Sequence, residues 1–528
     1  MNDLNPLLLQ LSVLIPFSAA LLLFLAPYWG AKLSRAIAFC GFIAPVAIAL
    51  WLLAHFTAST DAVTGYAFRS DLSTGLDLFG ISLKLGLNGI ALPLFLLAGI
   101  VGFVAGFYAL HTDAQRKEMY WMLLLFMLSG LMGTFASIDI FFFYFFHELA
   151  LIPTFIMIGI WGGAGRRAAA MEMTIYLTLG AMLSLLGLIA IYSRSGFHSF
   201  DLIELRTYLV AAPLAEALQH NIVGLLLFGF GILVSLFPFH TWAPRGYAAA
   251  PTSAAMLHAG VLKKFGLYGL IQVAGPLLIV GLNSWATALA WLALGNIVLI
   301  GLVTMAQRDL KQMIGYSSVM HMGYCFLGVV CLLSPEGRFL GAGGAVMLMF
   351  AHGLSVALSF LLATAIHQRT QTYDLKAMGG LCMKTPVLAA FFVAAILASA
   401  GLPGFANFWG EFSIFMGLWK YNPWLVVPAV LGIVISAIYG LRAVAHIFFG
   451  SPDEAFKDRL LSGSIQDILP YERICCLVLL GSLLVIGLWP KTISDPLNDS
   501  LQKVYEDVGV VLDYATASAE EFQNQSIL

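Results

Sequence analysis

A single carboxylate, Glu148, lies near the centre of an apolar run long enough to cross a bilayer, SIDIFFFYFFHELALIPTFIMIGIWGG over residues 137–163. Nothing nearby in the sequence neutralises its charge. An ionisable group at that depth costs roughly 2.5–3.5 kcal/mol on insertion scales, so its presence needs a reason. Asp139 stands nine positions earlier, near the expected membrane face. Glu148 is therefore either a packing residue bonded to a neighbouring helix or part of a proton or ion relay.

Acids and bases also occur inside other apolar runs. They are His258, Lys263, Lys264, His321, His352, Glu411, Arg442 and His446. Adjacent Lys263 and Lys264 point about 100° apart on a helix, so the two can hardly face the same partner. Any one histidine could be a satisfied core residue, or it could relay protons because its ordinary pKa lies near physiological pH. The set as a whole is difficult to explain by packing and indicates a path for protons or ions.

The composition is that of a membrane protein. Of the 528 residues, 60% are hydrophobic and 10% are charged, against roughly 25% charged in soluble domains. The mean hydropathy is +0.91. A net charge of -2 gives no electrostatic basis for binding nucleic acid. The six cysteines show no CxxC spacing, so the sequence predicts neither a disulfide framework nor an iron–sulfur cluster.

Apolar segments alternate with short loops along the chain and predict about fourteen membrane spans of roughly 20 residues each. They lie near residues 7–26, 35–56, 86–110, 120–137, 139–161, 170–193, 221–240, 251–276, 284–305, 312–333, 340–366, 386–410, 423–449 and 473–490. We therefore expect an all-α polytopic membrane protein. One transmembrane domain would cover residues 1–490, and a polar C-terminal tail would cover residues 491–528.

Basic residues are distributed unequally between the two sets of loops. Lys and Arg gather in the loops after odd-numbered spans, for example at Arg116, Arg166 and Arg167, and are sparse in the other loops. The positive-inside rule then places the basic loops inside and both termini outside. The first apolar run lacks a basic leader and an obvious cleavage site, which is typical of a retained span.

Two spans contain clusters of helix-breaking residues. The seventh reads LVSLFPFHTWAPRGYAAAPT, and the twelfth reads ASAGLPGFANFWGEF. Such residues survive at membrane depth where the freed backbone groups find new partners or line a wet cavity. A pair of interrupted spans, one in each half, is typical of a translocation site between two inverted repeats. We expect those repeats to be spans four to eight, residues 120–276, and spans nine to thirteen, residues 284–450.

Motifs from other functional classes fail on their spacing. His147 and Glu148 do not form the zinc motif HExxH, because position 151 is Leu and no second histidine follows. Residues 163–168 match a loose GxGxxA, but they lie in a loop between membrane helices without the strand that a dinucleotide site needs. No Walker A sequence occurs, which argues against ATP as the energy source. The sequence predicts no metal site.

Seven motifs follow one another along residues 86–450: the 137–163 run, PFHTWAP, APTSAAMLHAGVLKKFGLYGL, QRDLKQMIGYSSVMHMGY, AHGLSVALSF, DLKAMGGL and GLPGFANFWGEF. In these motifs the chain resembles the antiporter-like membrane subunits of respiratory complex I, the NADH:quinone oxidoreductase, and most of all those of the subunit M or chain 4 type. These belong to the Mrp antiporter superfamily. Mrp-type sodium/proton antiporters and membrane-bound hydrogenases use homologous subunits, so these are the alternatives.

The resemblance implies roles for five residues. Glu148 matches the family's fifth-helix glutamate, and Lys264 matches the central lysine of the eighth helix. Glu411 matches the twelfth-helix acid of the M type, and His321 and His352 fall on the central hydrophilic axis. Protons would cross a hydrated row of these groups while a Glu–Lys ion pair opens and closes.

The chain also departs from the family pattern. The family has a seventh-helix lysine that pairs with the glutamate, and this sequence has Leu233 at that position. Glu172 stands where many relatives have a basic residue, and His258 and Lys263 are additions. In one explanation the partner of Glu148 has moved to the eighth span, as His258, Lys263 or a water-linked Lys264. In the other, the path to Glu148 is degraded.

The resemblance also implies partners. They would be sister antiporter-like subunits and small membrane subunits of complex I, in a lipid bilayer that is most simply the bacterial cytoplasmic membrane. No cofactor is expected in this chain, since NADH, FMN, the iron–sulfur clusters and quinone belong to partner subunits. A third hypothesis, from another class, is an independent solute transporter.

Overall fold

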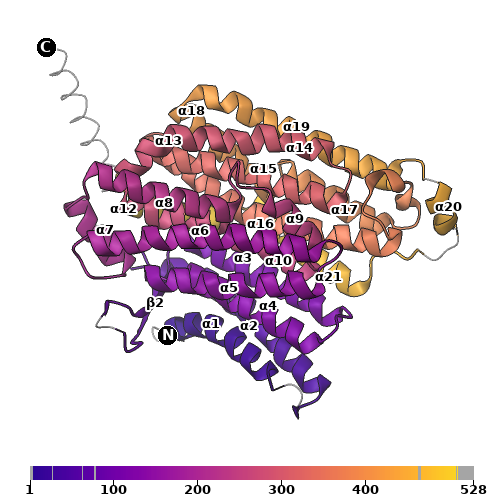
Figure 1. Ribbon diagram of the computed structural model, residues 1–528, viewed down its shortest axis with the longest axis horizontal. Coiled ribbons are helices and arrows are strands. Elements are labelled where there is room, and N and C mark those ends of the chain that lie inside the picture. Colours follow the sequence, from indigo (N-terminus) through magenta and orange to yellow (C-terminus); the bar gives the residue numbers. More distant parts are fainter. Residues whose placement is uncertain are drawn as a thin grey trace.

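Long helices lie side by side along the longest axis of the molecule (Figure 1). The computed structural model describes residues 4–25, 28–61, 63–76, 79–452, 454–461, 465–506 and 508. Within these ranges, twelve helices are long and apolar enough to cross a membrane. The expected all-α membrane architecture is confirmed, with one small β-hairpin added to it.

The first half of the chain contains these helices and strands: α1 (Leu4–Leu23), α2 (Ala31–Ser59), β1 (Ala67–Leu72), β2 (Leu83–Leu87), α3 (Ala91–His111), α4 (Lys117–Ala136), α5 (Ile140–Trp161), α6 (Arg166–Arg194), α7 (Leu202–Ala211), α8 (Glu216–Val234), α9 (Trp242–Ala249), α10 (Thr252–Gly260), η3 (Leu262–Lys264), α11 (Phe265–Gly269), η4 (Leu270–Ala274) and α12 (Gly275–Leu277).

The second half continues with α13 (Ile279–Leu294), η5 (Gly295–Ile300), α14 (Gly301–Ala306), α15 (Leu310–Val330), η6 (Cys331–Leu333), α16 (Arg338–Thr370), η7 (Leu375–Ala377), η8 (Leu381–Met383), α17 (Pro386–Ser399), α18 (Ala406–Tyr421), η9 (Pro423–Leu425), α19 (Val426–Val444), η10 (Ala445–Phe449), α20 (Glu454–Leu461) and α21 (Pro470–Leu488). Of the η segments, η4, η5 and η10 are π-helical and the others are 3-10 turns.

The two interrupted spans break where the proline and glycine clusters predict. Helix α8 ends at Val234 and α9 begins at Trp242, and we refer to residues 235–241 as the first break. Helix α17 ends at Ser399 and α18 begins at Ala406, and residues 400–405 are the second break. The expected span over 251–276 is also discontinuous, because it is divided into α10, η3, α11, η4 and α12.

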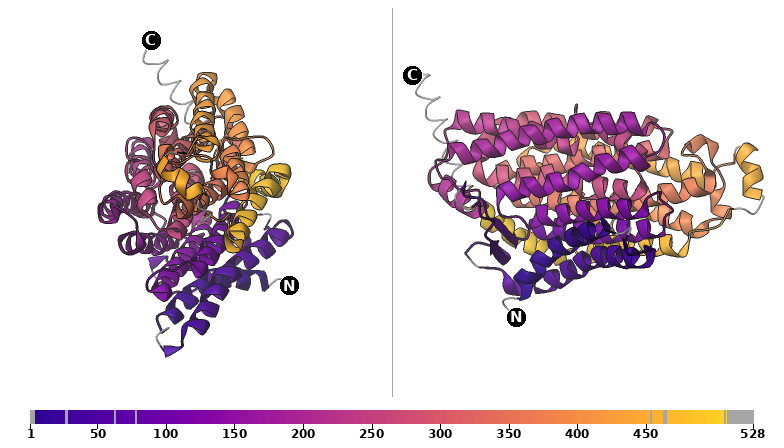
Figure 2. Two further views of the ribbon diagram at one scale, coloured as in Figure 1. Left: turned by 90° about the vertical axis from the view of Figure 1, so that its right-hand side faces the viewer. Right: turned by 60° about the horizontal axis from the view of Figure 1, so that its bottom comes forward.

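Helix α16 lies at the centre of the bundle, and its most apolar stretch of 18 residues is completely buried. It packs against α3, α10, α15, α17, α18 and α21. Helices α1, α2, α6 and α19 lie at the outside of the bundle, as the end-on view shows (Figure 2), and they expose apolar side chains such as Leu186 and Val434. An apolar exterior around a buried centre is the arrangement that a bilayer requires.

Two loop contacts have the same pattern of hydrogen bonds. Asp139 pairs with Asp201, and Asp309 pairs with Asp374, each as an antiparallel bridge. In each pair the residue after one aspartate donates its N–H to the carbonyl oxygen of the residue before the other, at 2.9–3.0 Å. Asp139 caps α5 and Asp309 caps α15, and burial raises the pKa of both, to about 6 for Asp139.

These two bridges lie at opposite ends of the bundle. Asp201 directly precedes α7, which lies at the left of Figure 1. Asp374 follows α16, whose last residue, Thr370, accepts a hydrogen bond from Arg459 of α20 at the right-hand end. The bonding pattern therefore occurs once at each end of the helices.

Two segments differ from the sequence expectation. Strands β1 and β2 form an antiparallel hairpin, with β2 occupying part of the expected third span. The expected polar tail begins as a helix over residues 491–506, and Leu497, Leu501 and Tyr505 are fully buried. Ser500 Oγ accepts a hydrogen bond from the N–H of Gly89 at 2.7 Å, which fixes this helix to the start of α3. Residues 509–528 of the expected tail lie outside the described residues.

Candidate functional site

Lys264 is positioned by a break in the helix that carries it. Helix α10 gives way to the 3-10 turn η3 after Gly260, which frees the carbonyl oxygen of Ala259. Nζ of Lys264 donates to that oxygen at 2.6 Å and lies 3.1 Å from Nδ1 of His352 on α16. Both acceptors suit an ammonium group, which has three donors and no acceptor.

Close approach of two backbones makes this contact possible. A Cβ atom on Gly353 would lie 2.5 Å from the carbonyl oxygen of Gly260, and one on Gly260 would lie 3.1 Å from that of Gly353. A side chain at Gly353 would force α10 and α16 apart, and one at Gly260 would be tightly crowded, so the two glycines allow the helices to cross closely. The crossing places Lys264 beside His352, although the two residues are 88 positions apart.

The polar contacts continue from His352 toward α18. The ring centroids of His352 and His321 lie 5.6 Å apart, and Nε2 of His321 lies 3.9 Å from Oε1 of Glu411. All four side chains are buried. We refer to Lys264, His352, His321 and Glu411 as the central row. In the described residues no hydrogen bond joins His352 to His321 or His321 to Glu411, so a proton crossing either gap would need a small movement or a bridging water.

Glu411 is held against the second break. A Cβ atom on Gly401 would lie 2.1 Å from Oε2 of Glu411, so the carboxylate packs directly on the glycine backbone. Gly401 has a φ of +72°, a conformation that glycine adopts without strain. Asn407 lies one turn before Glu411 and donates to Ser355 Oγ at 3.3 Å.

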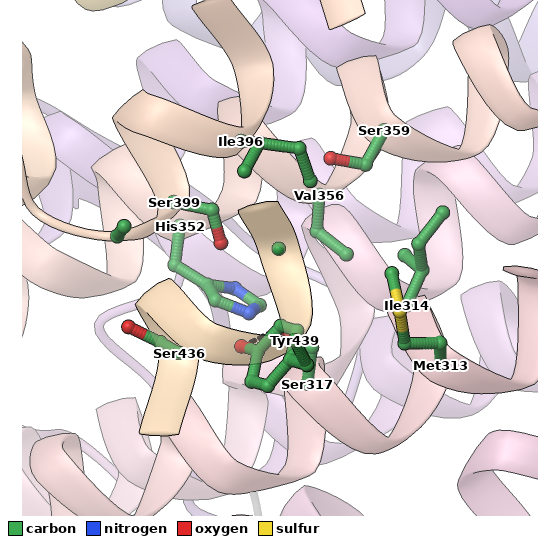
Figure 3. Close-up of a pocket in the computed structure, with 12 residues that line it drawn as sticks. Met313, Ile314, Ser317, His352, Val356, Ser359, Ile396, Ser399, Ser436 and Tyr439 are labelled. Carbon is green, nitrogen blue, oxygen red and sulfur yellow. Dashed lines mark hydrogen bonds between the residues drawn. The ribbon is translucent and has the colours of Figure 1, made fainter. Parts of the chain in front are cut away.

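A small cavity with a partly polar lining opens beside the central row (Figure 3). Figure 3 shows His352 at its wall, together with Ser399 and Tyr439 from two other helices. Its polar lining consists of Ser317, His352, Ser359, Ser399, Ser436 and Tyr439. The centres of water-sized spheres can occupy about 20 Å³ of it, which exceeds the roughly 10–15 Å³ needed for one water. The cavity can therefore hydrate the row between α15, α16, α17 and α19.

Lys263 faces a different set of side chains. Its Nζ donates to Ser318 Oγ at 3.3 Å and lies 5.6 Å from the centre of the Tyr247 ring. His258 also packs against that ring, at 5.3 Å between centroids. The described part of the chain offers no hydrogen-bond partner to two buried atoms here, Tyr247 OH and His258 Nδ1. Buried polar atoms of this kind usually bind water.

Glu148 lies apart from both lysines. Its side chain is 28% exposed, and its nearest basic atom is Nδ1 of His147 at 3.4 Å. Within the described ranges, Oε1 of Glu148 and Nδ1 of His147 have no hydrogen-bond partner, and Glu148 makes no ion pair with a lysine or arginine. Phe265 stacks on His147 at 3.8 Å. Leu233, where the family pattern has lysine, is buried.

The remaining predicted residues lie at the ends of helices. Asp139 accepts hydrogen bonds from the N–H groups of Phe141 and Phe142, so it caps α5 and does not contact the central row. Glu172 pairs with Arg245 at 3.1 Å. Arg442 donates to the carbonyl oxygens of Met305 and Gln307 near the end of α19.

Sequence reasoning missed several polar neighbours. Asn296 is fully buried in η5 and makes three hydrogen bonds, two of them to the first break. Ser317 and Ser318 contact Tyr439 and Lys263, respectively. An asparagine inside the apolar run LALGNIVLIGL was the available signal for Asn296. In the described residues, no three His, Cys, Asp or Glu side chains come together as a metal site would require.

Comparison with known proteins adds to this geometry. The family model described as "NADH:quinone oxidoreductase/Mrp antiporter, TM" matches residues 137–436. NADH-quinone oxidoreductase subunit M of Rickettsia bellii (strain RML369-C) is 33% identical over 455 residues, which cover 86% of this chain and 88% of that protein.

Solved structures agree with the sequence comparison. A chain of respiratory complex I from Thermus thermophilus with bound NADH superposes with a TM-score of 0.81 at 27% identity, covering 95% of this chain and all 100% of that one. A chain of the Mrp complex from Dietzia sp. has a TM-score of 0.82 at 18% identity, covering 96% and 99%, which shows a shared fold. The chain belongs to the NADH:quinone oxidoreductase/Mrp antiporter family of membrane subunits.

Proposed function

We propose that this chain is the proton-translocating membrane subunit, of the subunit M type, in a complex I-like NADH:quinone oxidoreductase. The observation that carries the proposal is the contact between Lys264 and His352 inside the bundle, continued by His321 and Glu411. Buried ionisable groups in a membrane protein are costly, and a continuous row of them is typical of a proton relay. The relatives named subunit M support the same function.

The central row supplies groups suited to passing a proton stepwise. Lys264 at 3.1 Å can donate directly to Nδ1 of His352. An imidazole can accept a proton at one ring nitrogen and release it from the other, so His352 and His321 can act as carriers. Glu411 ends the row as the acid beside the second break. Transfers among Lys264, His352 and His321 leave the donor neutral and charge the acceptor, whereas the last transfer neutralises both His321 and Glu411.

Lys263 and His258 provide a hydrated branch toward one end of the bundle. The unpartnered atoms of Tyr247 and His258 support bound water between α9 and α10. A cavity of about 620 Å³ opens at the end of these helices and is lined by residues that include Glu172, Asp309 and Lys311. We assign proton uptake to this branch, with Lys263 receiving the proton.

Glu148 acts in the first half of the path in this proposal. His147 is its neighbour at 3.4 Å and stacks on Phe265 of α11, which lies in the expected eighth span. We therefore favour the explanation in which the partner of Glu148 has moved to the eighth span, with His258 or a water-linked lysine in place of a residue at position 233. Relocation predicts that Leu233→Lys lowers proton translocation, whereas a degraded path predicts that this change is silent.

The five-helix repeats are also part of the proposal. The matching bridges Asp139–Asp201 and Asp309–Asp374, at opposite ends of the bundle, support two inverted repeats with one break in each. The transmembrane domain would cover residues 1–490. The distribution of basic loops supports an orientation with both termini outside. Partner subunits would carry the flavin, the iron–sulfur clusters and the quinone site. Asp139 would contribute to the relay only from the end of the bundle where α5 begins.

Purification of the tagged chain from its native membrane tests the function. We expect copurification of flavin and iron, and NADH-driven proton uptake by vesicles that contain the assembly. Copurification with antiporter subunits alone, and sodium/proton exchange without an electron donor, would instead indicate an Mrp-type antiporter. An active monomer with a bound solute would indicate an independent transporter.

A further inference from the structure

Each helix break frees a backbone carbonyl group, and a buried side chain satisfies it. At the first break, Nδ2 of Asn296 donates to the carbonyl oxygen of Ser235 at 3.1 Å, and to that of Val319 at 2.9 Å. Oδ1 of Asn296 accepts from the N–H of Phe237 at 2.6 Å. An amide does not titrate, so these three bonds persist at every physiological pH.

The second break uses a histidine in the corresponding role. Nε2 of His321 lies 2.9 Å from the carbonyl oxygen of Ser399, and Nδ1 lies 2.7 Å from that of Ser317. A neutral imidazole has one N–H group, whereas the imidazolium has two. Only the imidazolium can donate to both carbonyl oxygens at once.

Loss of the proton must disturb one of these two contacts. The deprotonated nitrogen directs a lone pair at a carbonyl oxygen, which is repulsive. Ser317 lies inside α15, where the helix ladder fixes its carbonyl group. Ser399 is the last residue of α17, and its carbonyl group has more freedom. The carbonyl group of Ser399, at the second break, is therefore the one that moves when His321 loses its proton.

Titratable groups from five elements face His321, and the contact from α17 is the carbonyl group of Ser399. They are Glu411 on α18 at 3.9 Å, His352 on α16 at 5.6 Å between rings, Tyr324 on α15 at 6.0 Å between rings, Tyr439 on α19 through Ser317 Oγ, and Lys263 on η3 at longer range. Among the residues that the structure describes, Glu411 is the one carboxylate within 4 Å of the ring. It can therefore balance the charge of the imidazolium.

We infer that the protonation state of His321 sets the geometry of the second break, so that this break responds to whether the central row holds a proton, while Asn296 keeps the first break fixed. The inference rests on the proposed function and deepens it, because it assigns the conformational response to the second half of the chain. The second break carries Gly401, which packs on Glu411, so its movement changes the contact between the acid and the row.

Hydrogen exchange of the intact complex at several pH values tests this inference. At the second break, the N–H groups of Gly401 and Leu402 donate to carbonyl oxygens in α17. At the first break, the N–H group of Leu236 donates to the carbonyl oxygen of Gly231 in α8. Both breaks therefore contain hydrogen-bonded amides whose exchange can be followed. After correction for the intrinsic pH dependence of exchange, we expect peptides over 400–405 to exchange at least about fivefold faster at high pH than at low pH. Peptides over 235–241 should exchange at the same corrected rate at low and high pH.

Exchanging the two side chains gives matched variants. His321→Asn should remove the pH response at residues 400–405, and Asn296→His should create one at 235–241. Equal pH profiles at the two breaks of the unsubstituted protein would overturn the inference, as would a pH response that survives His321→Asn. NADH-driven proton uptake is measured in parallel. Proton uptake with a pH-independent second break refutes the inference alone, whereas a responsive break without uptake refutes the proposed function.

Discussion

Nζ of Lys264 lies 3.1 Å from Nδ1 of His352, where the backbones of α10 and α16 cross at two glycines. The contact joins a broken helix to the most deeply buried helix of the bundle. It also begins the row that ends at Glu411. The proposed function requires this row to conduct protons.

The glycine beside Glu411 provides the first prediction. Gly401→Ala should impair proton translocation strongly, because the added Cβ would lie 2.1 Å from Oε2 of Glu411 and must displace the carboxylate. Gly404→Ala is the matched control. Gly404 also has a positive φ, +103°, but within the described part of the chain no heavy atom lies within 4 Å of the point that an added Cβ would occupy. Both variants should lose roughly 1–2 kcal/mol of stability from backbone strain. Equal effects of the two changes on translocation would contradict the role of Glu411.

Glu148→Gln should abolish or strongly lower proton translocation while the assembled complex still transfers electrons from artificial donors. The amide keeps the size of the side chain but cannot carry a proton. The ratio of protons moved to electrons transferred is the measurement. An unchanged ratio would count against an active relay at this position.

Leu233→Lys distinguishes the two explanations for the missing lysine. If the partner of Glu148 has moved to the eighth span, as His258, Lys263 or a water-linked Lys264, a new cation at position 233 competes with it, and translocation should fall. If the path is degraded, we expect the variant to translocate protons as the unsubstituted protein does, and its new lysine to pair with Glu148 in a structure. That second result would end the relocation hypothesis.

A buried ion pair joins α16 to α21 and predicts a stability difference. Nη2 of Arg369 lies 2.8 Å from Oε2 of Glu472, and the two side chains are 7% and 0% exposed. Glu472→Gln leaves the guanidinium without its counter-charge and should cost roughly 3–5 kcal/mol, whereas replacing both residues by apolar ones should recover much of that loss. Thermal unfolding of the purified complex measures both variants.

The exposed pair of Lys420 and Glu336 is the control for that experiment. Its side chains are 46% and 72% exposed, so Glu336→Gln should change stability by less than about 1 kcal/mol. Equal losses from Glu472→Gln and Glu336→Gln would show that the Arg369–Glu472 pair does not hold α21 in place.

Sequence patterns predicted the helices, the two breaks and four buried residues that the fold brings together as the central row. Apolar runs and helix breakers are local properties, so a single chain reveals them. The hairpin at residues 67–87 was missed because a short two-stranded ribbon has little periodicity. The helix over 491–506 was missed because its apolar positions, such as Leu497 and Leu501, are spread among polar residues.

The partners of the buried charges could not be predicted for a different reason. Spacing gives the face of a helix on which a residue lies, but not the neighbour that this face meets. Lys263 contacts Ser318, Lys264 contacts His352, and Glu148 contacts neither lysine. Asn296 escaped notice because amides carry no charge, although it makes as many hydrogen bonds as any member of the row.

Replacement of Lys264 by methionine tests the central claim most directly. The variant keeps most of the side-chain volume, removes the donor to His352, and is compared with Lys420→Met, which removes an exposed lysine. The measurement is the number of protons moved per electron by the complex in sealed vesicles with NADH as donor. We predict a lower ratio for Lys264→Met and the unsubstituted ratio for Lys420→Met. An unsubstituted ratio for Lys264→Met would contradict proton conduction along the row.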